Sequence, residues 1–446
     1  MKQILWFRRD LRIQDSAILA KAKDEVLPIF IFDKNILDKL DADDKRVTFI
    51  YNSVLELKSK LQSINLDLAI FYSYPKEVFT KLSNQNFDEI LCSVDFDSYA
   101  KKRDEEISKI LPMKKCLDSF LTNPINCLKK DNTPYKVFTP YYNSLDMITS
   151  SKLQTYQTPK TLKKISFDYS FVPSLEDLGF KKQVLPDFLN KTAEEVIDDF
   201  LPKMRTYQKD RDFFNINATS NISVHLRFGL ISVKKLFNQM RDIPNSEFFI
   251  RELFWREFYN YILYHFPKSE FENFNNKHIP WRNNEDEFKK WCEGNTGTPI
   301  IDAAMRHFNN TGTMHNRIRM IVSSYLCKNL LIDWKWGERY FASKLLDYEA
   351  SSNIGSWQWA ASTGADSVPY FRIFNPYTQS VKFDKEAVFI KSVIPELRDI
   401  LPKDIHTEYG LTNNLLINYP TPIIDIKESR LRAIDTFKHA KTKDKL

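Results

Sequence analysis

The chain has 446 residues, enough for about three domains of ordinary size, or for two domains with a long connection. Hydrophobic residues make up 43% and charged residues 28%, a composition typical of globular proteins. No run approaches 18 consecutive apolar residues, so we expect neither a transmembrane helix nor a membrane as partner. The net charge is +7, and the excess of Lys and Arg lies beyond residue 120. This charge suits a polyanion such as nucleic acid, but it is equally compatible with an ordinary charged surface.

The cysteines and glycines exclude several classes of protein. The five cysteines are an odd number without CxxC spacing, and the seven histidines are scattered, so we expect no disulfide framework, no metal site and a cytoplasmic location. The first of only nine glycines is Gly179. Phosphate-binding loops between a strand and a helix generally need glycine, because a Cβ blocks the approach of the backbone. The first 178 residues therefore contain neither a dinucleotide-binding fingerprint nor an NTP-binding loop.

Residues 1–118 alternate short β-rich runs with stretches of helical periodicity. This alternation predicts a parallel sheet covered by helices, in a Rossmann-like α/β domain. The expected strands are Gln3–Phe7, Val26–Asp33, Asp67–Ser73, Glu89–Val94 and Met113–Leu117. The expected helices are Arg46–Ile64, Lys76–Asn84 and Tyr99–Ile110.

The rest of the chain has a different character. Residues 119–190 are rich in Pro, Thr, Ser, Asn and Lys, which predicts a long, partly ordered connector. Helical periodicity then dominates, and Thr192 with Glu195 has the spacing of a capping box. We therefore expect an α/β domain over residues 1–118, a connector over 119–190, and a larger all-helical domain over 191–446.

Seven of the eight tryptophans lie between Trp255 and Trp359. Clustered indoles either fill a helical core or surround a redox cofactor, and clustering alone favours the core.

Two segments combine charged, polar and aromatic side chains at helical spacing. Phe249, Glu252 and Arg256 share one face of a predicted helix, with Trp255 beside them. This set suits a planar, anionic ligand, but it is also what an amphipathic helix with an ion pair contains. The hydroxyl-rich turn 219–223 precedes a helical run and predicts either phosphate binding or a plain N-cap.

Two further segments lie closer to the C-terminus. Asn316 and Met320 are four residues apart, and therefore on one face of a helix, with arginines at 317 and 319 beside them. Asp347, Glu349 and Asn353 precede the sequence Trp-Gln-Trp at 357–359. Two acids and an amide suit the edge of a flavin or a base, whereas the alternative is a helix end with core indoles.

These segments, in this order, resemble the DNA photolyase/cryptochrome family over nearly the whole chain. The motifs that carry the resemblance are Trp6–Arg12, Tyr135–Pro140, Trp291–Gly297, Asp302–Arg306, Met314–Met320 and Trp357–Gly364. Within the family the chain resembles class I cyclobutane pyrimidine dimer photolyases. The (6-4) photolyases have two histidines where this chain has Asn316 and Met320, which speaks against (6-4) repair.

The resemblance implies FAD, reduced when active, in the helical domain. Asn353 matches the amide that faces flavin N5, and Glu252 matches a carboxylate that contacts the lesion and assists catalysis. Trp357, Trp334 and Trp281 match an electron-transfer chain from the cofactor to the surface. The other positions that match cofactor-binding residues are Tyr207, Thr219, Ser220, Asn221, Ile222, Ser223, Phe249, Arg256, Arg319, Asp347, Tyr348 and Glu349.

The resemblance also implies DNA that contains pyrimidine dimers as the partner. A dimer inside a duplex is out of reach of the cofactor, so it has to be flipped out of the base stack, and photolyases are a named case of this rule. The positions that match the lesion pocket, with further candidate DNA contacts, are Arg211, Glu252, Trp255, Asn316, Arg317, Met320, Trp359, Arg372 and Gln379.

Some positions depart from the family pattern. Phe249 stands where many relatives have Trp, Glu349 where Asp is usual, and Asn221 in place of an arginine. The residues that bind an antenna folate in some relatives are missing, so a second antenna chromophore is possible but of unknown identity.

The predicted function is therefore a lyase that repairs dimers in the cytoplasm with light, as a monomer. A cryptochrome-like blue-light receptor with the same fold is the alternative. A flavin-dependent redox enzyme is a third possibility, although the glycine-free N-terminal region leaves no evident place for a nicotinamide.

Overall fold

A computed structural model describes residues 1–145, 151–412 and 417–440. The chain forms two compact units: Met1–Arg205 with Ser220–Pro267, and Thr206–Thr219 with Lys268–Leu446. The first unit thus includes helices that follow the α/β region in sequence. The predicted domain boundaries, which follow chain order, divide the protein differently and stay a prediction.

A parallel sheet forms the centre of the first unit. Its strand order is β3-β2-β1-β4-β5, so the order reverses between β1 and β4. The predicted strands are confirmed, and each bound lies within two residues of the expected one. A two-residue strand, β6, pairs with β2 and was not predicted, because two lysines carry no strand signal. The strands are β1 (Lys2–Phe7), β2 (Glu25–Asp33), β3 (Ala69–Ser73), β4 (Glu89–Ser93), β5 (Met113–Cys116) and β6 (Lys163–Lys164).

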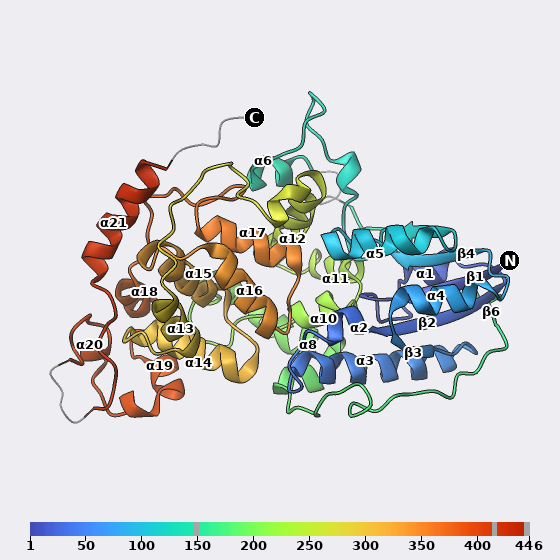
Figure 1. Cartoon of the computed structure of the whole chain (residues 1–446), viewed down its shortest axis with the longest axis horizontal. Coiled ribbons are helices and arrows are strands. Elements are labelled where there is room, and N and C mark those ends of the chain that lie inside the picture. The colour runs from blue at the N-terminus through green and yellow to red at the C-terminus, as the bar shows by residue number, and fades with distance from the viewer. Residues whose placement is uncertain (146–150, 413–416, 441–446) are drawn as a thin grey trace. The chain divides into compact units, whose positions relative to one another are not determined.

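Helices cover both faces of this sheet, as Figure 1 shows with α3 on one side and α4 and α5 on the other. Alternate strand residues enter two separate apolar clusters, because successive side chains of a strand point to opposite faces. Leu5 and Phe7 pack with α1 and α3, whereas Ile4 and Trp6 pack with α4 and α5. The predicted α/β layering is therefore confirmed. These helices are α1 (Ala17–Lys21), α2 (Lys34–Leu37), α3 (Lys45–Gln62), α4 (Pro75–Ser83) and α5 (Ser98–Ser108).

The segment between the sheet and the helices is anchored at several points. Leu175, Leu178 and Phe180 are buried against one face of the sheet. The carboxylate of Glu257 on α12 accepts hydrogen bonds from the main-chain N–H groups of Leu121 and Thr122, at 3.0 and 3.2 Å. The elements here are η1 (Pro124–Asn126), α6 (Phe138–Asn143), η2 (Asp187–Asn190), α8 (Ala193–Phe200), η3 (Leu201–Thr206), α10 (Ser223–Arg227), α11 (Val233–Met240) and α12 (Glu247–His265).

Helix α8 begins where the sequence predicts. The Thr192 hydroxyl accepts from the main-chain N–H of Glu195, and the Glu195 carboxylate accepts from the N–H of Thr192. Both bonds satisfy amides that the first turn of a helix leaves without partners. The predicted capping box is therefore confirmed.

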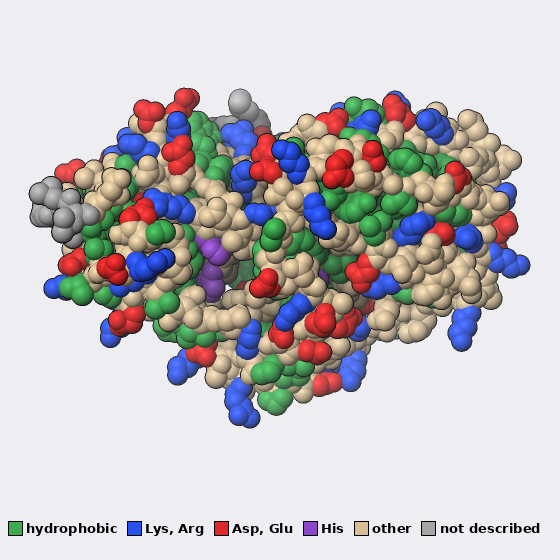
Figure 2. Space-filling view, turned by 90° about the horizontal axis from the view of Figure 1, so that it is seen from below, with side chains coloured by type: hydrophobic (Ala, Val, Ile, Leu, Met, Phe, Trp, Pro, Cys, Tyr) green, Lys and Arg blue, Asp and Glu red, His purple; other side chains and the backbone are tan. Residues whose placement is uncertain are grey.

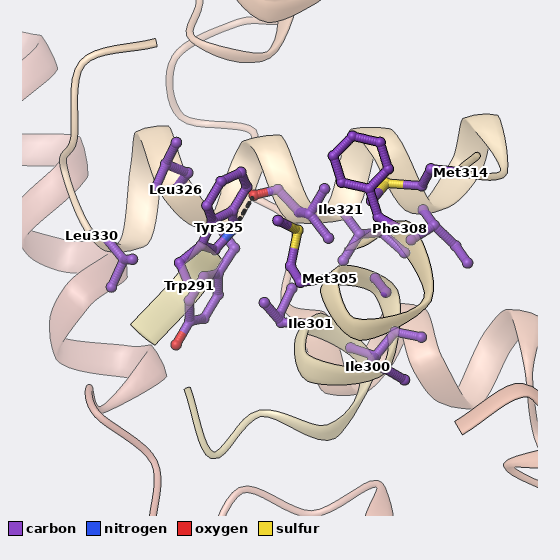
Figure 3. Packing of buried hydrophobic residues seen from close by; sticks show 14 of the residues in the cluster. Trp291, Ile300, Ile301, Met305, Phe308, Met314, Ile321, Tyr325, Leu326 and Leu330 are labelled. Carbon is purple, nitrogen blue, oxygen red and sulfur yellow. Dashed lines mark hydrogen bonds between the residues drawn. The ribbon is translucent and has the colours of Figure 1, made fainter. Parts of the chain in front are cut away.

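The second unit is helical around one large apolar core. Figure 3 shows part of this core, where Trp291 of α13 lies among side chains of α14 and α15, and its indole N–H donates to the carbonyl of Val322 at 3.3 Å. The helices are α9 (Tyr207–Asp210), η4 (Pro267–Glu270), α13 (Glu285–Glu293), α14 (Pro299–Thr311), α15 (Asn316–Ser324), the π-helical turn η5 (Tyr325–Asn329), α16 (Trp334–Lys344), α17 (Ala350–Ala360), α18 (Pro376–Phe383), α19 (Val388–Val393), η6 (Pro395–Leu397), α20 (Pro402–Ile405) and α21 (Ile426–Lys438).

Charged side chains of both signs are interspersed on the face drawn in Figure 2. The net positive charge is not gathered into one basic patch on that face. In the described ranges, no helix is long and apolar enough to cross a membrane, and no group of three or more His, Cys, Asp or Glu side chains is placed to hold a metal ion.

Gly337 of α16 allows this helix to approach α17 closely. A Cβ at position 337 would lie 2.2 Å from Cη2 of Trp357 and 2.6 Å from Cδ2 of Leu326. Both neighbours are buried in the core, so neither moves aside easily.

We expect Gly337→Ala to lower the free energy of unfolding by about 1–3 kcal/mol, the usual cost of overpacking a core. Urea denaturation measures this change. Arg339→Ala, an exposed change on the same helix, is the control and is expected to cost less than about 0.5 kcal/mol. Equal stability of the two variants would contradict the tight packing at residue 337.

Candidate functional site

Helix α12 presents a partly exposed stripe in the first unit. Glu252, Trp255 and Arg256 all lie on this stripe, whereas the residues between them are buried. The indole of Trp255 is stacked face to face on the ring of Phe138 from α6, with centroids 3.8 Å apart and planes 8° apart. Arg256 donates to the carbonyl of Ser119 at 2.8 Å. The structure therefore brings three of the predicted residues to one side of α12.

Two other predicted features of the first unit lack a distinctive geometry. Phe249 is buried, and its ring contacts Phe200 at a centroid distance of 5.0 Å. Helix α10 begins at Ser223 without a side-chain cap, and Asn221 before it has a left-handed φ of 54°. The expected plain N-cap is therefore absent at this helix. The flavin contact of Phe249 and the phosphate contact of residues 219–223 stay predictions.

In the second unit, the start of α15 is held by a histidine. Nδ1 of His315 accepts a hydrogen bond from the main-chain N–H of Arg317 at 3.1 Å, which makes it the N-cap. Burial lowers the pKa of His315, so its ring is neutral at neutral pH and keeps the lone pair that this bond needs. Asn316 and Met320 lie one turn apart at exposed and partly exposed positions.

The guanidinium of Arg317 is fixed on two sides. It donates to the Asp212 carboxylate at 2.7 Å and lies over the Phe383 ring at 4.9 Å. Neither Asp212 nor the cap by His315 was predicted from the sequence. The His315 cap had a weak local signal, since a polar residue precedes a helical run, but Asp212 lies far away in the chain.

Asn353 on α17 is oriented by a glutamate of α16. Its side-chain NH₂ donates to the carbonyl and to the carboxylate of Glu338, at 3.1 and 3.0 Å. The hydroxyl of Tyr348 donates to the same carboxylate at 3.4 Å. Burial raises the pKa of Glu338, and the hydrogen bonds from Asn353 and Tyr348 offset part of this rise. Because the NH₂ group is engaged, the amide oxygen of Asn353 is the atom left to accept from a ligand N–H. Nothing in the sequence singled out Glu338.

Arg319 and Asp347 form a two-point ion pair. One guanidinium nitrogen of Arg319 lies 3.1 and 3.0 Å from the two oxygens of Asp347, and Nε of Arg319 donates to the carbonyl of Met314 at 2.8 Å. Glu349 directly precedes α17 and is 7% exposed. The predicted acids are therefore close to the first turn of the helix that carries Asn353.

The Trp-Gln-Trp sequence places its two indoles differently. Two residues advance a helix by about 200°, so one indole faces inwards and the other outwards. Trp357 is 2% exposed and meets Phe341 edge to face at 5.0 Å, whereas Trp359 is partly exposed. Sequence alone favoured core packing for clustered indoles, and this is confirmed for Trp357 but not for Trp359.

The other two tryptophans of the predicted electron chain differ in exposure. Trp334 is 1% exposed, and its N–H donates to the amide oxygen of Asn273 at 2.7 Å. Trp281 is partly exposed and packs against Phe437 at 5.8 Å. The order Trp357, Trp334, Trp281 therefore leads from buried to partly exposed indoles.

The remaining predicted residues are distributed over the second unit. The guanidinium of Arg211 lies over the ring of Tyr207 at 5.5 Å, and Tyr207 itself is 7% exposed. Arg372 is exposed in a loop, and Gln379 lies on α18 at a partly exposed position. Within the described part of the chain, no hydrogen bond or ion pair joins Arg372 or Gln379 to the other predicted residues of this unit.

The chemistry of these residues fits a flavin. An isoalloxazine ring carries N–H groups and carbonyl oxygens along one edge, and the second unit offers an oriented amide oxygen, a carboxylate and a guanidinium. The indoles beside them are oxidisable side chains in a water-poor core.

Comparison with known proteins identifies the family. The family of the FAD binding domain of DNA photolyase matches residues 249–439, and the DNA photolyase family matches residues 3–160. A deoxyribodipyrimidine photo-lyase of Alkalihalophilus pseudofirmus is 33% identical over 97% of this chain and 97% of its own length. The chain belongs to the DNA photolyase family. The predicted family, α/β plus helical fold, lyase class and FAD cofactor of this photolyase are thereby confirmed, as is its role in light-dependent DNA repair.

Two solved structures match over nearly the whole chain. An archaeal photolyase from Sulfolobus tokodaii, with two FAD molecules, has a TM-score of 0.84 and 32% identity, and covers 98% of this chain and 100% of its own. A cryptochrome of Synechocystis has a TM-score of 0.85 at 23% identity, covering 98% of this chain and 99% of its own, and it shows the shared fold alone. The assignment to class I stays a prediction.

We expect Glu338→Gln to change how stability depends on pH. A carboxyl with a raised pKa binds its proton more tightly in the folded state, so its contribution to stability is lost as the pH rises through that pKa. The melting temperature of the variant relative to the wild type should therefore increase from about pH 4, below the ordinary pKa of a glutamate, to about pH 7.5. Differential scanning fluorimetry measures it, with the exposed Glu285→Gln as control. A difference that is constant with pH would contradict the raised pKa.

Proposed function

We propose that this photolyase splits cyclobutane pyrimidine dimers that are flipped out of the DNA stack, with light and reduced FAD. The single observation that supports this most is the exposure of the matched lesion residues. Trp255, Met320 and Trp359 are partly exposed on their helices, although large apolar side chains usually fill a core, and the polar Glu252 and Asn316 are likewise open to solvent.

We propose that the residues matched to cofactor contacts hold FAD. Asn353 offers its amide oxygen, Asp347 and Arg319 present a carboxylate and a guanidinium, and Glu349 lies at the start of the same helix. When bound, reduced FAD would supply the electron-transfer chemistry, because it donates one electron to the dimer after absorbing light. The further holding residues are Tyr207, Thr219, Ser220, Asn221, Ile222, Ser223, Phe249, Arg256 and Tyr348.

The lesion residues serve to bind and orient the dimer. The indoles of Trp255 and Trp359 offer flat apolar surfaces on which the bases of a flipped dimer can stack, and stacking on an aromatic side chain is worth about 1–3 kcal/mol per base. The carboxylate of Glu252 accepts a hydrogen bond from a ring N–H of the flipped pyrimidine, which orients the base for electron transfer. Asn316, Arg317 and Met320 occupy the first turns of α15, whose position is fixed by the contacts of Arg317 and His315.

The three tryptophans serve to reduce oxidised FAD. The N–H of Trp334 is bonded to an amide oxygen, and an amide does not take up its proton at ordinary pH. Among the described residues, the indole N–H of Trp281 has no hydrogen-bond acceptor, and this indole is partly exposed to water. Once oxidised, the indole of Trp281 would therefore release its N–H proton to water, and this loss makes the electron transfer hard to reverse.

A cryptochrome-like receptor is the second candidate, favoured only by the shared fold of the Synechocystis protein. The retained lesion residues favour repair. We further propose that the protein acts as a monomer in the cytoplasm, in accordance with five free cysteines, four of them buried.

Irradiation of the reduced protein with an oligonucleotide that contains a thymine dimer tests the function. We expect light-dependent recovery of thymine, and we expect Glu252→Ala to lower the yield per photon severalfold with FAD content unchanged. Glu247→Ala, at the start of the same helix, is the matched control. Absence of any recovery from a reduced, DNA-bound sample would favour the receptor.

Trp281→Phe separates photoreduction from repair. Phenylalanine is much harder to oxidise than tryptophan, so we expect photoreduction of oxidised FAD to slow at least tenfold. Repair by chemically reduced enzyme should be unchanged. Absorbance at the flavin band during illumination follows the reduction. Trp336→Phe, a partly buried indole outside the proposed chain, is the control. Normal photoreduction in Trp281→Phe would place the electron path elsewhere.

A further inference from the structure

Arg251 shares the partly exposed stripe of α12 with Trp255. The two residues are four apart, so they lie one turn from each other on the same face of the helix. Both are partly exposed, whereas Leu253 and Phe254 between them are buried. Arg251 is not among the residues matched to the lesion site, although it directly precedes Glu252.

Aromatic rings of α6 hold this guanidinium in place. Its central carbon lies 5.0 Å from the ring centroid of Phe138 and 5.2 Å from that of Tyr142. These two rings are themselves stacked, at 5.7 Å and 18°, and Phe138 is the same ring that supports the indole of Trp255. Phe138 is completely buried, so this platform is rigid. One set of rings therefore positions both Arg251 and Trp255.

Most N–H donors of the Arg251 guanidinium have no acceptor among the described residues. Its only hydrogen bond in the described part of the chain goes to the hydroxyl of Thr139, at a long 3.4 Å, and no carboxylate there lies within ion-pair distance. A guanidinium has five N–H donors in a planar fork that matches a phosphate. Arg256, on the same stripe, is by contrast engaged with a main-chain carbonyl.

We propose that Arg251 binds a backbone phosphate of the DNA beside the lesion, and that Phe138 positions it for this contact. The proposal rests on the proposed function, since it requires that DNA lies along this stripe of α12. Phosphate is the partner that the geometry favours, because the donors are planar, partly exposed and without an anionic partner in the described chain. The contact would strengthen binding without reading the sequence of bases.

The salt dependence of DNA binding tests the proposal. The logarithm of the DNA-binding constant falls linearly with the logarithm of the salt concentration, and each phosphate contact makes this slope more negative by about 0.9. Fluorescence anisotropy with a dimer-containing duplex, and with the undamaged duplex, gives this slope between 50 and 300 mM NaCl. For Arg251→Gln we expect the slope to be shallower by about 1. We also expect the affinity to fall by up to about tenfold, by a similar factor for the damaged and the undamaged duplex. The repair yield of bound dimers and the FAD content should not change.

Two variants serve as controls. Lys109→Gln on α5 removes one exposed cation that is paired with Glu105, and it corrects for the change in net charge. Arg251→Lys keeps the charge but not the fork, so it should keep most of the slope while losing part of the affinity. A slope for Arg251→Gln equal to that of the wild type and of Lys109→Gln overturns the proposal. If the wild type itself gives no light-dependent repair, the proposed function fails instead.

A double-mutant cycle tests the ring platform. Phe138→Leu keeps an apolar side chain but removes the flat surface below the guanidinium. We expect Arg251→Gln to change the slope less in the Phe138→Leu background than in the wild type, because the fork is already misplaced. Melting curves confirm that the leucine variant is folded. An equal effect in both backgrounds overturns the positioning role of Phe138.

Discussion

The close packing of Trp357 against Gly337 is the contact on which much of the second unit depends. It determines how near α17 lies to α16, because the edge of the Trp357 indole packs directly against the main chain of α16 at Gly337. Helix α17 also carries Asn353 and Trp359, and α16 carries the glutamate that orients Asn353. A single interhelical distance therefore affects the positions of three side chains for which we propose a role: the Asn353 amide, the partly exposed indole of Trp359 and the buried indole of Trp357.

The arginines among the candidate site residues of each unit are mostly held in place before any ligand binds. Arg317 is fixed by a carboxylate and an aromatic ring, Arg319 by a carboxylate and a carbonyl, and Arg256 by a carbonyl. Fixed guanidinium groups lose little conformational entropy when they bind, which favours both affinity and precise placement. The N-cap of α15 is also in place before any ligand binds. Burial keeps the ring of His315 uncharged, so that Nδ1 can accept its hydrogen bond.

The sequence predicted the sheet well because its signal is local. The strands β1 to β4 are short, largely apolar runs, and the bounds of β1 to β5 lie within two residues of the predicted ones. The Thr192–Glu195 capping box is likewise a contact between residues three apart. The roles of the site residues came from resemblance to a family, not from spacing alone.

The residues that the sequence did not reveal have distant partners. Asp212 pairs with Arg317 across about a hundred residues, and Phe138 stacks on Trp255 from a segment that was predicted only as a connector. Glu338 meets Asn353 only because two helices pack side by side. Such contacts follow from tertiary packing, for which a single sequence gives no periodic signal.

The opposite placement of Trp357 and Trp359 makes the length of α17 critical. Insertion of one residue before this pair would rotate both indoles by about 100° and would place neither where it is now. The described irregular stretches of the connector are less constrained, because a residue inserted between two of their anchoring contacts leaves the contacts themselves in place. Length variation among descendants of this gene should therefore accumulate in the connector and be absent from α17.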